Sequence, residues 1–416
     1  MNSLLIVETL AIGDELLTGK IADSNSAFVG GALFENGFRL SRQNVIPDEK
    51  KAIQSAIGEL AARAHVVVCF GGLGPTSDDI TAAVVAELIQ KPLVEDPASR
   101  ERLIAYLNSR QRSLTEQTLK QVRVPEGSEV IPNFVGAAPG FRISLGQCQF
   151  FFLPGVPDEM KPMFHHSVMS VIKRNSPVSG EVESCVWRCI GIVESEVQRL
   201  MDPIESSLPD GMWLGYRTRF PENYLYLYCH APDPQKRKSL IEKWKPEIES
   251  RLEPFCYGRE DRDLETWVLD LLKSKKKNIV CAESCTGGLV VQRLTQISGA
   301  SDWVWGGFVT YQIAAKQDML GIRLNQSTDA VSQQCSVQLA QAALAKSGCD
   351  IALGITGYMG PTGGTADEPL GTVWIAVANR EGKLLTERIG LPPRSRALLQ
   401  WGAASFALNA VRKFLK

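Results

Sequence analysis

The chain has 416 residues, of which 44% are hydrophobic and 22% are charged, and its formal net charge is -1. This length suggests about two to four domains, and the composition excludes a disordered protein and a coiled coil. The near-neutral charge gives no global reason to bind nucleic acid or an anionic membrane, so we expect neither as a partner.

The first region, residues 1–174, alternates short apolar runs with segments of helical periodicity. The predicted strands and helices are Leu4–Ile12, Asn25–Asn36, Lys50–Ala64, Val66–Phe70, Ala82–Gln90 and Gln149–Leu153. Strands that are apolar on both faces and are separated by helices indicate a parallel sheet covered by helices. We therefore predict a layered α/β domain here.

The middle region, residues 175–258, has a different texture. The alternation of apolar and polar residues predicts half-exposed strands at Val182–Ile192 and Tyr224–His230. Helices are predicted at Glu194–Ser206 and Pro234–Leu252. This pattern predicts a small α+β module, and no concentrated polar motif occurs in it. We interpret it as a spacer or oligomerisation domain and expect a homodimer.

The last region, residues 259–416, begins with the charged linker Arg259–Asp263 and returns to an α/β pattern. Helices are predicted at Leu264–Ser274, after Gly287, at Ser332–Lys346 and at Ser395–Phe414. Strands are predicted at Asn278–Ala282, Trp305–Tyr311, Ile351–Ile355, Thr372–Ala378 and Leu384–Ile389. The sequence thus predicts a second α/β domain.

The cellular setting follows from what the chain does not contain. No apolar run reaches the ~18 residues of a spanning helix, and the N-terminus lacks the pattern of a signal peptide. The ten cysteines are scattered without any C-x-x-C pair, which is typical of buried thiols rather than of a zinc site. We expect a cytoplasmic protein in a reducing compartment.

Two glycine-rich turns in the last region are candidates for a binding site. Ala282-Glu-Ser-Cys-Thr-Gly-Gly288 lies between a predicted strand and a predicted helix, a position that suits a phosphate or an oxyanion. An ordinary helix cap made by Ser284 or Thr286 is the alternative. The loop Gly357–Thr365 follows another strand, and such loops meet at the carboxyl edge of a parallel sheet. Two such loops at one edge favour a ligand site.

The possible chemistry is limited because all four histidines precede this domain. A Ser-His-Asp arrangement therefore cannot form within it. If Ser284 is a nucleophile, its proton must go to a lysine, a tyrosine or a carboxylate, and Tyr311 and Lys316 follow a predicted strand. Burial would be needed to make the lysine a base. Cys285 is a rival nucleophile, although a small buried thiol is the preferred interpretation.

These residues resemble the C-terminal domain of CinA proteins. The resemblance extends over Ala282–Gly288, Gly307-Phe-Val-Thr-Tyr311 with Lys316, Gly360-Pro-Thr-Gly-Gly-Thr365 and Gly371–Val377. It implies hydrolysis of nicotinamide mononucleotide to the nicotinic acid nucleotide and ammonia, without a cofactor. The implied roles are Ser284 as nucleophile, Lys316 as base, Tyr311 as a positioning or relay group and Thr356 in the pocket. The implied substrate contacts are Gly287, Gly288, Gly360, Thr362, Gly363, Gly364 and Arg394.

The sequence departs from the family pattern at two places. Tyr358 and Met359 stand where small apolar residues are common. The run Pro392-Pro-Arg394-Ser-Arg396-Ala-Leu398 lacks the usual glycine and second arginine before the last helix. We take Arg394 as the better match for the substrate contact, with Arg396 as the alternative after a shift.

A third glycine-rich turn follows the buried strand at Val66–Phe70. Its predicted ligand contacts are Gly71, Gly72, Gly74, Pro75 and Thr76, whose N–H groups or side chains can cradle a phosphate. Asp78 and Asp79, with Asp14 and Glu15 after another strand, supply the oxygen ligands that Mg²⁺ or Mn²⁺ prefers. A tight turn with a capping aspartate, and solvated acids, are the alternatives.

The first region resembles the molybdopterin-binding fold and, in detail, the N-terminal CinA domain. The matching segments are Ile12–Asn25, Gly71–Thr81, Asn133–Phe141 and Leu153–Met160, and Gly191–Ser195 and Arg217–Asn223 fit the full-length family. The resemblance implies a three-layer α/β domain with ADP-ribose pyrophosphatase activity that depends on Mg²⁺, Mn²⁺ or Co²⁺, with K⁺ as a further candidate. The alternative is a module that binds a nucleotide or a molybdopterin-like ligand, or regulates, without cleaving anything.

Overall fold

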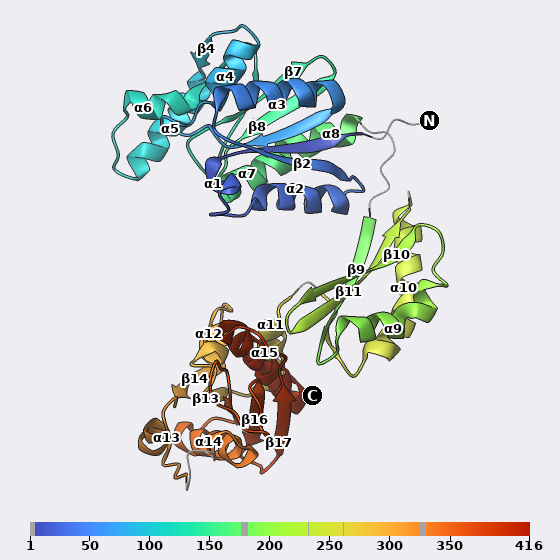
Figure 1. The fold of residues 1–416 in the computed structure, drawn as a ribbon, viewed down its shortest axis with the longest axis vertical. Helices are drawn as coiled ribbons and strands as arrows, with labels where there is room; N and C mark the ends of the chain where they lie inside the picture. Colours follow the sequence, from blue (N-terminus) through green and yellow to red (C-terminus); the bar gives the residue numbers. More distant parts are fainter. Residues whose placement is uncertain (1–4, 176–181, 232, 261, 325–329) are drawn as a thin grey trace. The chain divides into compact units, whose positions relative to one another are not determined.

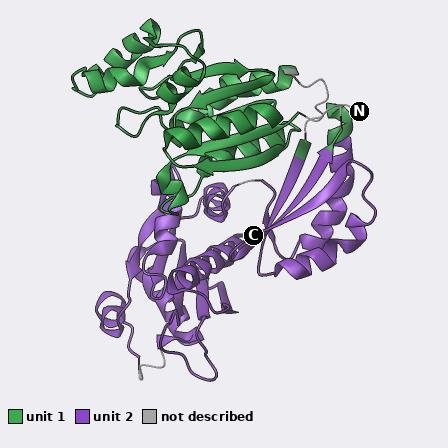
Figure 2. Cartoon of the chain, turned by 45° about the horizontal axis from the view of Figure 1, so that its top comes forward, with its two compact units in different colours: residues 1–183, 230–237 green, residues 184–229, 238–416 purple. Residues whose placement is uncertain are grey.

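The computed structural model describes residues 5–175, 182–231, 233–260, 262–324 and 330–416. Figure 2 colours its two compact units, residues 1–183 with 230–237 and residues 184–229 with 238–416. Most of the predicted middle module, residues 184–229 and 238–258, belongs to the second unit together with the C-terminal domain, and each has a sheet of its own. Leu4, where the first strand was predicted to begin, lies outside the described residues.

The first unit contains a six-stranded sheet in the order β2-β1-β3-β8-β7-β6. The strands are β1 Val7–Ile12, β2 Leu40–Ile46, β3 Val66–Phe70, β6 Glu129–Ile131, β7 Gly140–Leu145 and β8 Cys148–Leu153. The first four in the sheet order are parallel, as predicted, but β7 and β6 are antiparallel. Only two residues join β7 to β8, and Gly146 has a φ of 59°, so the connection is a tight hairpin that forces antiparallel pairing.

Helices cover both faces of this sheet and confirm the predicted three-layer α/β fold (Figure 1). The covering helices are α2 Ser24–Glu35 and α7 Pro157–Met163 on one face, and α3 Lys50–Arg63 and α4 Thr81–Leu88 on the other. Strand β3 shows why both faces are apolar. Val66, Val68 and Phe70 pack in the core beneath α2 and α7, whereas Val67 and Cys69 pack beneath α3 and α4.

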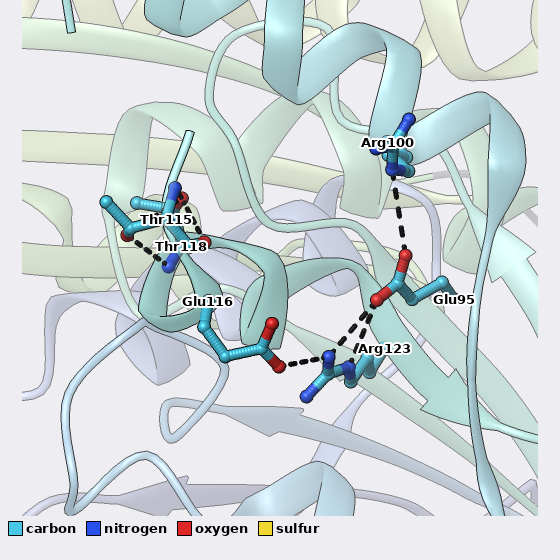
Figure 3. Close-up of polar contacts among 6 residues, drawn as sticks. All are labelled: Glu95, Arg100, Thr115, Glu116, Thr118 and Arg123. Atoms are coloured by element: carbon cyan, nitrogen blue, oxygen red, sulfur yellow. Dashed lines mark hydrogen bonds and ion pairs between the residues drawn. The ribbon is translucent and has the colours of Figure 1, made fainter. Parts of the chain in front are cut away.

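A smaller helical arm extends from this domain. It consists of β4 Leu93–Glu95, α5 Pro97–Ser109, α6 Glu116–Leu119 and β5 Arg123–Pro125. Arg123 is paired with Glu116 and, at 3.1 Å, with Glu95, which Arg100 approaches to 3.7 Å (Figure 3). Such surface pairs are individually weak, but together they join two strands and two helices of the arm.

The middle module has a four-stranded sheet in the order β10-β11-β9-β12. The strands are β9 Val182–Ile190, β10 Met212–Arg219, β11 Glu222–His230 and β12 Cys256–Gly258, and the helices are α9 Glu194–Glu205 and α10 Pro234–Leu252. Both helices pack on one face of the sheet around the buried side chain of Trp187. The mixture of antiparallel strands and two helices agrees with the predicted α+β module.

The C-terminal domain has a five-stranded sheet in the order β14-β13-β15-β16-β17. The strands are β13 Ile279–Glu283, β14 Val304–Val309, β15 Ile351–Gly357, β16 Thr372–Asn379 and β17 Leu384–Gly390. The first three are parallel, whereas β16 is antiparallel to β15 and β17 is antiparallel to β16. Residues 380–383 form the short turn between β16 and β17, and the longer loop of residues 358–371 joins β15 to β16. The parallel pairing brings the ends of β13 and β15 to one edge.

Helices also cover both faces of the C-terminal sheet (Figure 1). One face carries α11 Leu264–Lys275, α12 Leu289–Thr295 and α15 Arg396–Leu415, and the other carries α14 Gln333–Ser347, beside α13 Ile313–Leu320. The remaining helices are α1 Asp14–Leu17, α8 Met169–Asn175 and the turns Lys120–Val122, Phe164–Val168 and Ala300–Asp302. In the described part of the chain, no helix has the length and apolarity needed to cross a membrane.

Candidate active site

Glu283, at the end of β13, organises the turn that carries Ser284. Its carboxylate is fully buried and accepts hydrogen bonds from the N–H groups of Gly288, Val290 and Val291 at 3.0, 3.1 and 2.9 Å. The N–H group of Gly287 donates to the carbonyl of Ser284 at 3.2 Å. Glu283 therefore occupies N–H groups at the start of α12 that the predicted anion cradle would have offered to a ligand.

Ser284 and Lys316 form the centre of the site. The Nζ atom of Lys316 lies 2.9 Å from the Oγ atom of Ser284 and donates a second hydrogen bond to the carbonyl of Thr310 at 2.6 Å. Only 1% of Lys316 and 8% of Ser284 are exposed. Burial lowers the pKa of Lys316 below its ordinary value, because the charged ammonium loses its hydration there. The structure thus brings the predicted nucleophile and base together.

The neighbouring thiol of Cys285 has the opposite electrostatic character. Cys285 is 3% exposed and packs in the core beneath α15. Burial raises the pKa of its thiol to about 12, because the thiolate would be desolvated. Since the thiolate is the nucleophilic form of cysteine, this environment disfavours Cys285 as the attacking group.

Tyr311 is paired with Arg396. Its ring is 58% exposed, and its hydroxyl accepts a hydrogen bond from Arg396 at 2.7 Å. Arg396 also donates to the carbonyl of Gly360, so it joins Tyr311 to the second glycine loop. Arg394, which the sequence favoured, instead lies over the ring of Phe220 with 5.8 Å to the centroid. The structure therefore places the alternative, Arg396, and not Arg394, between Tyr311 and the second glycine loop.

The other predicted residues of this half lie around the second loop. Thr356 is buried at the end of β15. Its hydroxyl donates its proton to the carbonyl of Ala330 at 2.6 Å, so that this proton takes part in a hydrogen bond within the protein. The side chain of Met359 is buried in the core, which accounts for this departure from the family pattern. The loop glycines have positive φ values and Thr362 is exposed; these residues are Gly360, Thr362, Gly363 and Gly364.

The N-terminal candidate site is a cavity of about 550 Å³ at the carboxyl ends of β1, β3 and β8. Glycine is required in its turn. At Gly71, with a φ of 101°, a Cβ atom would lie 2.3 Å from the carbonyl oxygen of Ile12, and at Gly72 it would lie 2.0 Å from Thr81. The predicted residues in its lining are Glu15, Gly71, Gly72, Gly74, Pro75, Asp78 and Asp79.

The two adjacent aspartates have different tasks. Asp79 accepts hydrogen bonds from the N–H group and the hydroxyl of Thr76 at 2.8 and 2.5 Å, so it holds the glycine turn. Asp78 is exposed. The structure thus assigns the orienting role to Asp79, where the sequence left the choice open, and neither aspartate caps the next helix, α4.

Asp48 is a further acid of this site. It accepts a hydrogen bond from the N–H group of Asp14 at 3.1 Å. Burial, followed by the charges of Glu15, Asp14 and Asp78, raises its pKa. Among the described residues, however, no three potential ligands gather closely enough to hold a metal ion. The predicted ligand set does not form a preassembled ion site, so we derive no chemical step through a metal.

Sequence reasoning missed Glu283 and Asp48 as site residues. A signal existed for Glu283, because an acid at the end of an apolar strand that is buried on both faces must find hydrogen-bond donors. Asp48 lies in a polar loop before α3, where an acid is unremarkable. Only the fold brings it to Asp14.

Comparisons with known proteins agree with this architecture. The family model described as CinA C-terminal domain matches residues 261–415, and the probable molybdopterin binding domain matches residues 8–174. A CinA-like protein of Desulfosudis oleivorans is 35% identical over 415 residues, covering 99% of this chain and 100% of the relative. One of Shewanella piezotolerans is 33% identical, covering 98% and 96%. The crystal structure of CinA from Thermoplasma acidophilum is 31% identical, covers 40% of this chain and 98% of that one, and has a TM-score of 0.37. The chain therefore belongs to the CinA family.

Proposed function

We propose that the C-terminal domain hydrolyses the carboxamide of nicotinamide mononucleotide, releasing ammonia and the nicotinic acid nucleotide. The observation that carries the proposal is the buried Lys316, whose Nζ atom lies 2.9 Å from the Oγ atom of Ser284. A lysine with a lowered pKa next to a serine is an arrangement that can activate the hydroxyl without histidine.

The chemistry follows from the two protonation states of Lys316. In its neutral form, one N–H bond points to the carbonyl of Thr310, and the lone pair can accept the proton of Ser284. The Oγ atom then bonds to the amide carbon, and Lys316 gives the proton to the departing ammonia. Water attacks the resulting acyl-serine, Lys316 accepts the proton of that water, and the proton returns to the Oγ atom of Ser284.

A test compares two neighbouring substitutions. Ser284→Ala should lower the rate of ammonia release from nicotinamide mononucleotide by a factor of about 10³ or more, because the nucleophile is lost. Cys285→Ala is the matched control and should retain most of the rate. The serine mechanism is wrong if Ser284→Ala remains active while Cys285→Ala does not.

For the N-terminal domain we propose hydrolysis of ADP-ribose to AMP and ribose 5-phosphate. The supporting observation is the cavity beside Gly71 and Gly72, which is large enough for a nucleotide. Mg²⁺ is commonly bound by one or two carboxylates together with the phosphates of a substrate. We propose that Asp78 and Glu15 would hold an ion in this way once the pyrophosphate of ADP-ribose is bound. A binding or regulatory module is the alternative.

The two possibilities for the N-terminal domain differ in turnover. The purified protein should release AMP from ADP-ribose in at least one of Mg²⁺, Mn²⁺, Co²⁺ or K⁺, measured by chromatography. Binding of ADP-ribose in calorimetry without AMP under all four ions would favour the binding module.

A further inference from the structure

Two cysteines face each other across antiparallel strands in the middle module. Cys256 on β12 is directly opposite Cys189 on β9. The neighbouring pair of residues, Ile190 and Phe255, is the one joined by a backbone hydrogen bond, from the N–H group of Ile190 to the carbonyl of Phe255 at 3.1 Å. This pattern marks a non-hydrogen-bonded pair, in which the Cα atoms are ~4.5 Å apart. That separation lies within the ~4.4–6.8 Å range of disulfides.

One of the two thiols can be reached from solvent. Cys256 is partly exposed and lines a cavity of about 700 Å³, whereas Cys189 is fully buried. As a thiol, Cys256 donates to the carbonyl of Gly258 at 3.2 Å. The charged residues of the cavity lining are Glu249, Glu253, Arg259, Arg412 and Lys416, and Glu249 is paired with Arg259 at 3.1 Å.

The electrostatic environment separates the two thiols. A hydrogen bond from Cys189, with the charges of Arg259 and Arg412, lowers the pKa of Cys256. The hydrogen bond to Cys256, followed by burial, raises the pKa of Cys189. Cys256 is therefore suited to attack an oxidant, and Cys189 is suited to react with the product of that attack.

We propose that Cys189 and Cys256 form a reversible disulfide when the protein meets hydrogen peroxide. The thiolate of Cys256 attacks one peroxide oxygen, forming a sulfenic acid and releasing hydroxide. The thiol of Cys189 then attacks the sulfenic sulfur, forming the S–S bond and releasing water. A dithiol reductant returns both thiols. The bond fixes β12 to β9 where Ile190 and Tyr257 pack into the core of the C-terminal domain.

The chain contains a matched control pair. Cys69 and Cys148 are close enough for their charges to interact, and both are buried. They are not opposite each other, because Cys69 is paired with Phe152 and Cys148 with Leu145. Proximity alone would therefore also predict a disulfide between Cys69 and Cys148, whereas register combined with access predicts the Cys189–Cys256 bond.

The experiment treats the folded full-length protein with hydrogen peroxide, blocks the remaining thiols and identifies tryptic peptides by mass spectrometry. Two of the ten cysteines should no longer react with the blocking reagent. They should appear instead as a disulfide link between the peptide that begins at Cys189 and the peptide Leu252–Arg259. Trypsin cuts after Arg188, so Cys185 lies on a separate peptide. The link should disappear with dithiothreitol, and no link should join Cys69 to Cys148.

Two variants test the order of the steps. Cys189→Ser should leave a sulfenic acid at Cys256 that dimedone traps, and Cys256→Ser should leave Cys189 unmodified. The proposal is overturned if Cys185 is the linked residue, if the link forms only in denaturant, or if Cys256 remains a thiol in the folded protein.

Discussion

Lys316→Met separates the contribution of Lys316 to catalysis from its effect on stability. Methionine has a similar length and fills the same buried volume, but it can neither accept the proton of Ser284 nor donate to the carbonyl of Thr310. Ammonia release should fall to the level of Ser284→Ala. Stability should respond differently, because burial of Lys316 opposes its charged form.

The contribution of Lys316 to the free energy of unfolding depends on pH. Each unit by which folding lowers the pKa of Lys316 below its unfolded value of ~10.4 destabilises the charged form by about 1.4 kcal/mol. That penalty is fully present below the folded pKa, declines as the pH rises from the folded pKa to the unfolded one, and is absent above both. The hydrogen bonds of the ammonium to Ser284 and to the carbonyl of Thr310 are already included in the folded pKa. The pH dependence is therefore the sharper test, because it separates the titration of Lys316 from the other effects of the substitution.

The assay is thermal unfolding of the wild type and of Lys316→Met between pH 7 and pH 10. As the pH rises, the wild type should gain free energy of unfolding relative to the variant, by about 1.4 kcal/mol for each pKa unit of the shift that this range covers. Lys346→Met, at an exposed lysine, is the control and should show little pH dependence relative to the wild type. A constant difference for Lys316→Met, or a loss for the wild type, would refute the lowered pKa.

Three further predictions concern the two sites. Arg396→Met should lower kcat/KM for deamidation roughly tenfold or more, because a charged hydrogen bond is lost, whereas Arg394→Met should not lower it. Equal effects of the two substitutions in kinetic assays would contradict the placement of Arg396. Asp79→Asn should impair ADP-ribose hydrolysis and loosen the turn at Thr76 more than Asp78→Asn does, and the reverse order would favour Asp78 as an ion ligand. A chelator should leave ammonia release unchanged while it reduces AMP formation, and loss of ammonia release would contradict a deamidase without a metal.

The sequence alone determined much of the secondary structure and the presence of two α/β domains. Val66–Phe70 and Pro234–Leu252 were predicted with the bounds that the structure shows. These segments are readable because a strand buried on both faces is apolar at every position, and a long helix has a continuous period. Strand direction was harder to predict from the segments themselves, since β16 is as apolar as the parallel strands although it pairs antiparallel with both β15 and β17.

Because the domain has no histidine, the sequence limited the proton acceptor for Ser284 to a lysine, a tyrosine or a carboxylate, and the resemblance to CinA proteins implied Lys316. Their meeting could not be derived, since Ser284 and Lys316 are 32 residues apart and lie on different elements. The same holds for the choice of Arg396 over Arg394. Arg396 is the first residue of α15, whereas Arg394 precedes the N-cap residue Ser395, and only tertiary packing sets where each side chain lies. Local patterns thus determine which elements form, and tertiary packing decides which side chains share a site.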